Sequence, residues 1–329
     1  MVSMQEVIIV GGGLSGLVAA QTLKANGVSA LVLDKGKSTG GRLATRRLQD
    51  GLADHGAQFF TVRTPVFQEE VDRWMAANVV RVWGYGWSDG SLKRTASDGH
   101  PRYIANNGMN AIAQHLEIGL DVRVNVQVKQ IEWTGEHWLL TDTEEGIYIG
   151  KKLILTPPVP QSLELLAKGN VPLSDKNRQE LGRILYDPCL CGMFVVEGGV
   201  ELPEPGAVQN FNQPVYWIAD NQAKGISDVC VITTHASATF SRENYDAPEE
   251  ETLAKLAQPL ELWMKPDAHI VESQLKKWRY SAAITTHAQD YIHADELPLF
   301  FAGDAFGGRG RVEGAFISGQ SAAKALLEL

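Results

Sequence analysis

The sequence predicts an α/β dinucleotide-binding domain of the Rossmann type that is interwoven with a second, α+β domain. A buried strand, a glycine-rich turn and a helix follow one another at the start of the chain. Mixed strand and helix candidates fill the middle, and dinucleotide-domain character returns after Leu297. We therefore expect a discontinuous first domain over residues 1–75, 105–160 and 290–329, and a second domain over residues 76–104 and 161–289.

The chain begins with a compact βαβ unit. Glu6–Val10 is a β-branched apolar run, typical of a strand buried on both faces, and it ends in a glycine turn. Apolar residues then recur at helical spacing over Leu14–Lys24, and Asn26-Gly27 closes the segment as a helix C-cap would. A second strand over Ala30–Leu33 completes the unit.

The glycine turn has the pattern that lets a phosphate approach the backbone. In Gly11-x-Gly13-x-x-Gly16 the glycines allow a tight turn and a close contact between helix and strand, while the helix N-terminus offers unpaired amides and a positive dipole. Asp34, eighteen residues after Gly16, stands where a ribose needs an acceptor; the alternative is a solvated residue at a strand end. Its charge repels a 2′-phosphate, which leaves FAD or NAD rather than NADP.

Composition and charge exclude several classes of partner. The 329 residues carry 30 Lys and Arg against 39 Asp and Glu, a formal charge of −9, so nucleic acid would be repelled. No eighteen apolar residues follow one another, which excludes a membrane-spanning helix, and the N-terminus lacks the basic region of a signal peptide. Three cysteines cannot all pair within the chain, so we expect a reducing, cytoplasmic location.

Cys189 and Cys191 are separated by one residue within an apolar run. This spacing suits a strand and places both thiols on one side of a sheet. A redox dithiol is the alternative, but free cysteine most often behaves as a small buried hydrophobe. No Cys-x-x-Cys pair or histidine cluster accompanies them, so we expect no metal site.

Between about residues 160 and 290 the sequence predicts an antiparallel sheet with flanking helices, and further elements are expected before and after this region. Residues 78–104 indicate loops or short strands, and residues 109–117 a short helix. Strands are expected over 122–128 and over 152–156, where Pro157 ends the run. The other predicted elements are helices around 174–185, around 248–264 and from Gly314 to the end, and strands near 190–197, 214–219, 229–235 and 299–302.

Further motifs resemble those of the flavin amine oxidase superfamily. Gly40-Gly41-Arg42 is similar to the second glycine-arginine loop with which these enzymes contact the FAD pyrophosphate, and Arg42 would donate charge-assisted hydrogen bonds to it. Read alone, this segment is equally an ordinary surface turn. Phe301-Ala302-Gly303-Asp304 resembles the strand-end Gly-Asp that holds the ribityl chain and a phosphate in many FAD enzymes. The motifs in this order span the whole chain.

The same resemblance extends to both ends of the predicted cofactor site. Glu313-Gly314-Ala315 opens the last helix, whose dipole in the resembled families favours the reduced flavin, and Val126-Gln127-Val128 resembles the strand that meets the adenine. The resemblance implies an FAD-binding domain of the p-hydroxybenzoate hydroxylase and amine oxidase type. The expected cofactor-binding residues are Gly11, Gly13, Leu14, Ser15, Gly16, Asp34, Lys35, Gly41, Arg42, Val128, Gly303, Asp304, Glu313, Gly314 and Ala315.

Several motifs are absent from the sequence, and their absence excludes some classes of flavoenzyme. No cysteine lies near the C-terminal flavin motif, so we expect FAD to be bound without a covalent link. No Cys-x-x-Cys or Cys-x4-Cys segment follows the first motif, which removes a dithiol reductase. A second Gly-x-Gly-x-x-Gly unit is also absent, so we expect no separate docking domain for a nicotinamide cofactor.

Short segments look most like the renalase-type branch of the superfamily. These are Asp54–Phe60 and Trp278–Tyr280, while Asn107–Asn110 resembles the Gly-Met loop of amine-oxidase-like proteins more generally. The resemblance implies oxidation of 2- and 6-dihydro isomers of NAD(P), with electrons passed to O2 to form hydrogen peroxide. Such substrates need no strong base, because the ring nitrogen lone pair expels the hydride and the product gains aromaticity.

In flavin chemistry the cofactor accepts the hydride, while the protein positions the reactants, supplies the electrostatic surroundings and controls the access of oxygen. For aromatic candidates the alternative is core packing, and for histidines a structural hydrogen bond. A flavin-containing amine oxidase, an aromatic-ring hydroxylase and a flavin carrier without turnover stay open as other functions. The residues that we expect on the reactive face of the flavin are Gln58, Phe59, Trp217, His235, Trp278, Tyr280 and His287.

Overall fold

The computed structural model describes residues 3–91, 97–308 and 310–329, in two compact units. The first unit comprises 1–42, 112–186 and 282–329, and the second comprises 43–111 and 187–281. Residues 92–96 of the predicted loop region, residues 1–2 of the predicted first domain and Arg309 lie outside the described residues.

These boundaries differ from the predicted ones at each crossing between the units. Residues 43–75 and 105–111 belong to the second unit, because Leu48 and Ala53 pack against its sheet. Residues 161–186 belong to the first unit, because the helices there pack on the first sheet. Residues 282–289 also belong to the first unit. Which unit binds cofactor and which binds substrate stays a prediction.

The first unit is built on an eight-stranded, mostly parallel sheet with the order β16-β17-β10-β1-β2-β7 and a β8–β9 hairpin attached to β10. The central strands run parallel, whereas β16 and β9 pair antiparallel with their neighbours. The strands are β1 (Met4–Val10), β2 (Ala30–Leu33), β7 (Asp121–Arg123), β8 (Val128–Trp133), β9 (Trp138–Asp142), β10 (Ile147–Leu155), β16 (Ile292–His293) and β17 (Leu299–Phe301).

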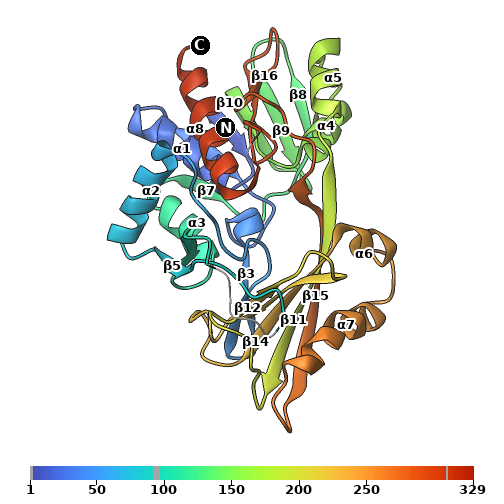
Figure 1. The fold of residues 1–329 in the computed structure, drawn as a ribbon. Coiled ribbons are helices and arrows are strands. Elements are labelled where there is room, and N and C mark those ends of the chain that lie inside the picture. Colours follow the sequence, from blue (N-terminus) through green and yellow to red (C-terminus); the bar gives the residue numbers. More distant parts are fainter. Residues whose placement is uncertain (1–2, 92–96, 309) are drawn as a thin grey trace. The chain divides into compact units, whose positions relative to one another are not determined.

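Helices cover both faces of this sheet. On one face α1 (Leu14–Ala25) and α8 (Arg311–Leu327) lie side by side over Val7 and Ile9 (Figure 1). Ile8 and Val10 belong to the opposite core, together with α4 (Val159–Lys168) and α5 (Asp175–Gly182). Because β1 buries both faces, its sequence is a continuous apolar run rather than an alternating one.

The predicted βαβ unit is confirmed, including the end of α1 near Asn26 and the left-handed Gly27 (φ 77°). The single strand predicted over 122–128 is wrong. Asn125 adopts a left-handed conformation (φ 57°), which separates β7 from β8. The last helix begins at Arg311, three residues before the predicted Gly314.

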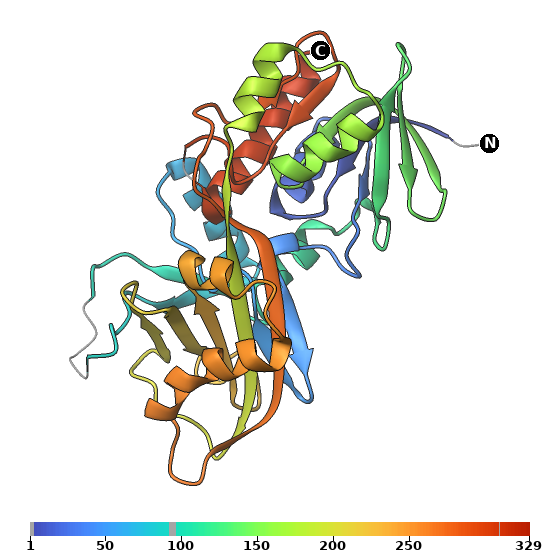
Figure 2. The same ribbon diagram turned by 90° about the vertical axis from the view of Figure 1, so that its right-hand side faces the viewer.

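The second unit is built on a five-stranded sheet with the order β12-β13-β14-β11-β15. The pairs β12–β13, β13–β14 and β11–β14 are antiparallel, as predicted, and Figure 2 shows the long strands β11 and β15 side by side. The bounds are β11 (Tyr186–Glu197), β12 (Ala207–Gln209), β13 (Val215–Asp220), β14 (Val231–Ala236) and β15 (His269–Ala283).

Alternate residues of β14 face two different layers. Ile232 and Ala236 join a core with α7 (Glu249–Ala257), whereas Val231 and Thr233 contact the hairpin of β3 (Thr45–Leu48) and β4 (Gly51–Asp54). The polar residues of this second face form the site described below. The remaining elements are α2 (Pro65–Ala76), β5 (Val80–Gly84), β6 (Arg102–Ala105), α3 (Asn110–Leu116), α6 (Ala238–Glu243) and the short 3-10 helices Gly41–Leu43 and Gln258–Leu262.

Cys189 and Cys191 lie on β11 and are buried, and in the described chain both are free thiols, as is Cys230. Burial raises the pKa of Cys189 to about 12. A thiolate is therefore unfavourable there, which supports the structural interpretation over a redox dithiol. Within the described ranges no helix is long and apolar enough to cross a membrane, and no group of acidic, cysteine or histidine side chains is arranged to hold a metal ion.

Candidate functional site

The glycine turn after β1 is closed toward the sheet and open at its middle. A Cβ on Gly16 would lie 2.0 Å from the carbonyl oxygen of Gly11, and a Cβ on Gly11 would lie 2.4 Å from Thr156 Oγ1. A Cβ on Gly13, in contrast, would meet none of the described atoms within 4 Å. Side chains are therefore excluded where the backbone packs, while the open side at Gly13 leaves the amides accessible to a phosphate.

The N-terminus of α1 has polar groups without a side-chain hydrogen-bond partner among the described residues. Its N-cap, Gly13, provides no capping side chain, so the first amides lack a side-chain acceptor. Ser15 Oγ is buried and has no hydrogen-bond partner among the described residues. Free amides and an unpaired hydroxyl at a helix N-terminus fit an anionic phosphate.

The second glycine loop lies directly against this turn. Gly40 forms a parallel β-bridge with Gly13, and the Gly40 N–H donates to the Gly12 carbonyl at 2.8 Å. Gly41 adopts a left-handed conformation (φ 54°), and a Cβ there would approach Gly13 Cα to 3.4 Å. The two glycine motifs that the sequence singled out thus meet within the first unit.

Asp34 ends β2 with its carboxylate held by the backbone. The Gly12 N–H donates to Oδ2 and the Gly36 N–H donates to Oδ1, each at 2.6 Å. A simple solvated strand end does not describe this half-buried, doubly bonded carboxylate. Because a carboxylate can accept about four hydrogen bonds, Asp34 keeps the capacity to accept from a ribose hydroxyl.

Arg42 and Asp304, both expected to contact the cofactor, form a bidentate ion pair with two N–O distances of 2.7 Å. Burial by itself lowers the pKa of Arg42, but the charge and hydrogen bonds of Asp304 outweigh it and raise that pKa. The Gly303 N–H donates to Ser318 Oγ of α8 at 2.9 Å. The strand-end Gly-Asp is thereby tied both to α8 and to the second glycine loop.

The other expected cofactor residues differ in exposure. Leu14 and Val128 are buried, whereas Lys35 is exposed. Glu313 is buried in the first turn of α8, a favourable end of the helix dipole for an acid, and Gly314 and Ala315 follow it in the helix.

In the second unit a buried ion pair joins segments that are far apart in sequence. Lys224 Nζ donates to Asp54 Oδ2 at 2.6 Å, and both side chains are 0% exposed. Lys224 Nζ also donates to the Gln58 carbonyl at 2.6 Å and lies 5.0 Å from the ring centroid of Trp83. Burial lowers the pKa of Lys224, while the charge of Asp54 opposes that shift.

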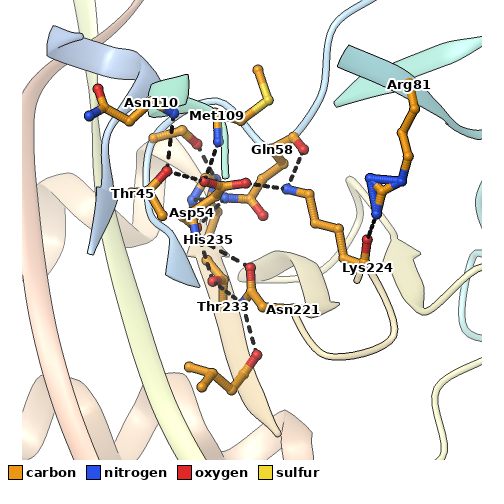
Figure 3. Close-up of polar contacts among 12 residues, drawn as sticks. Thr45, Asp54, Gln58, Arg81, Met109, Asn110, Asn221, Lys224, Thr233 and His235 are labelled. Atoms are coloured by element: carbon orange, nitrogen blue, oxygen red, sulfur yellow. Dashed lines mark hydrogen bonds and ion pairs between the residues drawn. The ribbon is translucent and has the colours of Figure 1, made fainter. Parts of the chain in front are cut away.

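The Asp54 carboxylate also holds the turn before α3 (Figure 3). Its Oδ1 accepts from Thr45 Oγ1 at 2.5 Å and from the Met109 N–H at 2.8 Å. Thr45 Oγ1 in turn accepts from the Asn110 N–H at 3.1 Å. The Asn107–Asn110 segment, which the sequence likened to a Gly-Met loop, is therefore fixed by Asp54.

Gln58, in the segment after β4, lies next to His235 on β14. Gln58 Nε2 donates to the Asp54 carbonyl at 2.6 Å and lies 3.5 Å from His235 Nε2. His235 is the cross-strand partner of Trp217 on β13 and of Cys191 on β11. Burial lowers the pKa of His235 to about 4, so this imidazole is neutral at pH 7.

Aromatic rings surround these polar groups. The Phe59 ring lies 5.4 Å from that of Trp217 and 5.0 Å from that of Trp87. His55 stacks on Trp278 with ring centroids 5.4 Å apart, and Trp278 Nε1 donates to the His55 carbonyl at 2.8 Å. Burial, aided by nearby cationic side chains, lowers the pKa of His55 to about 3.

The structure brings most of the expected flavin-face residues into this unit. Gln58, Phe59, Trp217 and His235 form one cluster, and Trp278 contacts the same segment through His55. Tyr280 is half-buried on the same strand as Trp278. His287 belongs to the first unit, where its ring lies 6.1 Å from that of Phe306.

The central role of Lys224 was not predicted from the sequence. It follows β13 in a short polar segment that is typical of a solvated turn, and 170 positions separate it from Asp54. His55 was noted within its motif but not as a stacking partner. In both cases the contact joins segments that are distant in the sequence and come together only in the folded protein.

Two family models match the chain. A model of the NAD(P)-binding Rossmann-like domain matches residues 9–74, and a model of the flavin-containing amine oxidoreductases matches residues 75–327. The renalase of Mus musculus is 25% identical over 310 residues, which is 87% of this chain and 87% of that protein.

Solved structures of oxidases share the fold. A protein from Exiguobacterium sp. 255-15, assigned as a protoporphyrinogen oxidase, matches with a TM-score of 0.72 and 13% identity over 100% of this chain and 99% of its own. A redesigned putrescine oxidase matches with a TM-score of 0.67 and 16% identity over 99% of each chain. At these identities the likeness concerns the fold alone, and together with the family models it confirms the predicted fold class.

Proposed function

Because the chain belongs to the family of flavin-containing amine oxidoreductases and is a renalase-like, FAD-dependent oxidase, we propose that its substrates are dihydronicotinamides. The 2- and 6-dihydro isomers of NAD(P) would be oxidised to NAD(P)+, with O2 reduced to hydrogen peroxide. FAD supplies the hydride acceptor for such a reaction. The residues of the chain supply binding, orientation and the state of the nearby protons.

We propose that the first unit holds FAD through the residues expected from the sequence. The open backbone at Gly13, the Ser15 Oγ that has no partner among the described residues, and the carboxylate of Asp34 fit the phosphates and ribose of a dinucleotide. The three cysteines are buried in the second unit, which supports non-covalent binding and a reducing cytoplasmic location. Acid or heat should therefore release intact FAD, whereas colour retained by the precipitate would contradict this.

The observation that carries the proposed reaction is the protonation state of the cluster in the second unit. Burial lowers the pKa of His235 to about 4 and that of His55 to about 3, so both are poor proton acceptors at pH 7. Lys224 is bound to Asp54. A dihydronicotinamide can lose hydride without a base, whereas an amine substrate must first lose its ammonium proton.

The aromatic rings of the cluster support the same substrate class. Phe59, Trp87 and Trp217 lie with ring centroids 5.0 to 5.4 Å apart, and His55 stacks on Trp278. Planar rings of this kind bind other planar rings by offset or edge-to-face contacts. We propose that the cluster residues contact the nicotinamide ring.

Anaerobic mixing with candidate donors tests the proposal. The 2- and 6-dihydro isomers should bleach the flavin absorption within seconds, and air should then restore it with formation of peroxide. Ordinary 4-dihydro NADH should react about 100-fold more slowly, because its reactive carbon is displaced by about an ångström. Rapid bleaching by a primary amine or a catecholamine, with none by the isomers, would favour an amine oxidase, the alternative that the family match supports.

A further inference from the structure

Gln58 presents a buried hydrogen-bond acceptor that none of the described residues uses. Its Nε2 donates to the Asp54 carbonyl at 2.6 Å and to the Gly56 carbonyl at 3.3 Å. Both partners only accept, so the amide nitrogen must face them and Oε1 must point away. Oε1 is buried, on a side chain that is 6% exposed, and it has no partner in the part of the chain that the structure describes.

The surrounding network fixes the groups to which the Gln58 side-chain amide is bound. Lys224 binds the Gln58 carbonyl and the Asp54 carboxylate, each at 2.6 Å, and so holds both ends of the segment (Figure 3). Thr233 Oγ1 donates to the Asp54 carbonyl at 2.9 Å and fixes that group as well. A buried acceptor that is held without a donor is costly to a protein unless a ligand supplies the donor.

The groups around Gln58 define what kind of donor fits. His235 is uncharged at pH 7, and the charges of Lys224 and Asp54 compensate each other. Phe59, the next residue, and Trp217 offer aromatic faces. The surroundings thus suit a neutral N–H donor on a planar ring, whereas an anionic group would meet the negative end of the Gln58 amide.

We infer that Gln58 Oε1 accepts a hydrogen bond from the carboxamide N–H2 of the substrate's nicotinamide ring and thereby selects the amide over the acid. The inference rests on the proposed function for the identity of the substrate. A nicotinic acid ring has the same shape but a carboxylate in place of the amide. It has no N–H to give, and its charge repels Oε1, so a site built for the amide should reject it.

The test compares 6-dihydronicotinamide mononucleotide with 6-dihydronicotinic acid mononucleotide in anaerobic bleaching. The wild type should prefer the amide by on the order of 100-fold or more. Gln58→Met, which keeps the length but replaces the amide by a thioether that accepts only weakly, should reduce that preference to within about 5-fold. Because the ratio of the two rates is compared between variants, the difference in intrinsic reactivity between the two compounds cancels. A purely structural role of Gln58 would slow both equally and leave the ratio unchanged, which would overturn the inference.

Thr233→Val is the matched control. It removes another hydrogen bond to the same Asp54 carbonyl without touching the Gln58 amide, so the ratio of the two rates should stay at its wild-type value. If Thr233→Val lowers the ratio as much as Gln58→Met, general loosening of the segment explains both, and the inference fails. An unchanged ratio in Gln58→Met, together with a shifted flavin spectrum or weaker FAD binding, would assign Oε1 to the cofactor instead.

A second measurement needs neither turnover nor a folded variant. Titration of the oxidised wild-type holoenzyme with nicotinamide and with nicotinate, followed by the flavin absorption, should show binding of the amide at least about 10-fold tighter. Equal affinity, or tighter binding of nicotinate, overturns the inference. If no dihydronicotinamide bleaches the flavin although this preference is observed, the proposed reaction fails while the selection of the amide over the acid stands.

Discussion

The two units build their candidate sites by different means. The first relies on backbone: glycines at positions 11, 13 and 16 shape a turn whose amides stay open, and a few side chains complete it. The second relies on side chains, with Asp54 and Lys224 fully buried at its centre. The glycine turn is formed by residues close together in the chain, whereas the side-chain site depends on contacts between distant segments. Substitutions should therefore act on binding in the first and on folding in the second.

Lys224→Met gives the sharpest test of this contrast. It leaves the Asp54 charge buried without a counter-ion, and breaking a buried pair costs about 3–5 kcal/mol of unfolding free energy. Denaturant unfolding followed by tryptophan fluorescence measures it, because six of the eight tryptophans lie in the second unit. The double variant Asp54→Asn/Lys224→Met removes both charges and should regain part of the loss. A loss below about 1 kcal/mol would show that the pair is not central.

Acid should weaken the second unit in a defined pH window. Folding lowers the pKa of His55 to about 3 and that of His235 to about 4, from 6.5. Below pH 6.5 the unfolded chain therefore binds more protons than the folded one. The contribution of the two neutral histidines to the free energy of unfolding is fully present above that pH and is lost as the pH falls toward 4. Each histidine should cost about 2 kcal/mol between pH 6.5 and 5. His235→Gln should reduce the slope of unfolding free energy against pH by about half. An unchanged slope would contradict the neutral assignment.

The same contrast explains how much could be predicted. The glycine turn and Asp34 were predicted from local spacing, and the second glycine loop from its resemblance to the flavin amine oxidases. The structure brings all three together. Lys224 had no such signal, since its partner lies 170 positions away and its own surroundings resemble an exposed turn. Asn125 misled the strand prediction because the alternating pattern does not report one left-handed residue. The local backbone conformation can be predicted from short motifs. A buried ion pair between distant segments depends on the topology, which a short motif does not reveal.

Asp34→Ala tests the backbone site of the first unit. It removes the proposed ribose acceptor and the acceptor for two backbone amides, so FAD affinity should fall by roughly 1–3 kcal/mol. Asp34→Asn keeps one carbonyl oxygen and should lose less. Titration of the apoprotein with FAD measures both, with Lys37→Ala, an exposed neighbour, as the control. Unchanged affinity in Asp34→Ala would remove Asp34 from the cofactor site.

Glu251→Gln is expected to have the smallest effect, and it isolates burial as the cause of the largest one. Lys255 Nζ lies 2.7 Å from Glu251 Oε1 on α7, nearly the same distance as in the buried pair, but these side chains are 43% and 55% exposed. Water screens the charges and the pair spans i and i+4 of one helix, so its loss should cost only about 0.3–0.5 kcal/mol. The glutamate is changed because Lys255 also donates to Asn244 Oδ1 at 2.8 Å, and substituting the lysine would remove both contacts. The same denaturant unfolding measures the change, which should shrink further at high salt. A cost comparable to that of Lys224→Met would mean that short distance, rather than burial, sets the strength of both pairs.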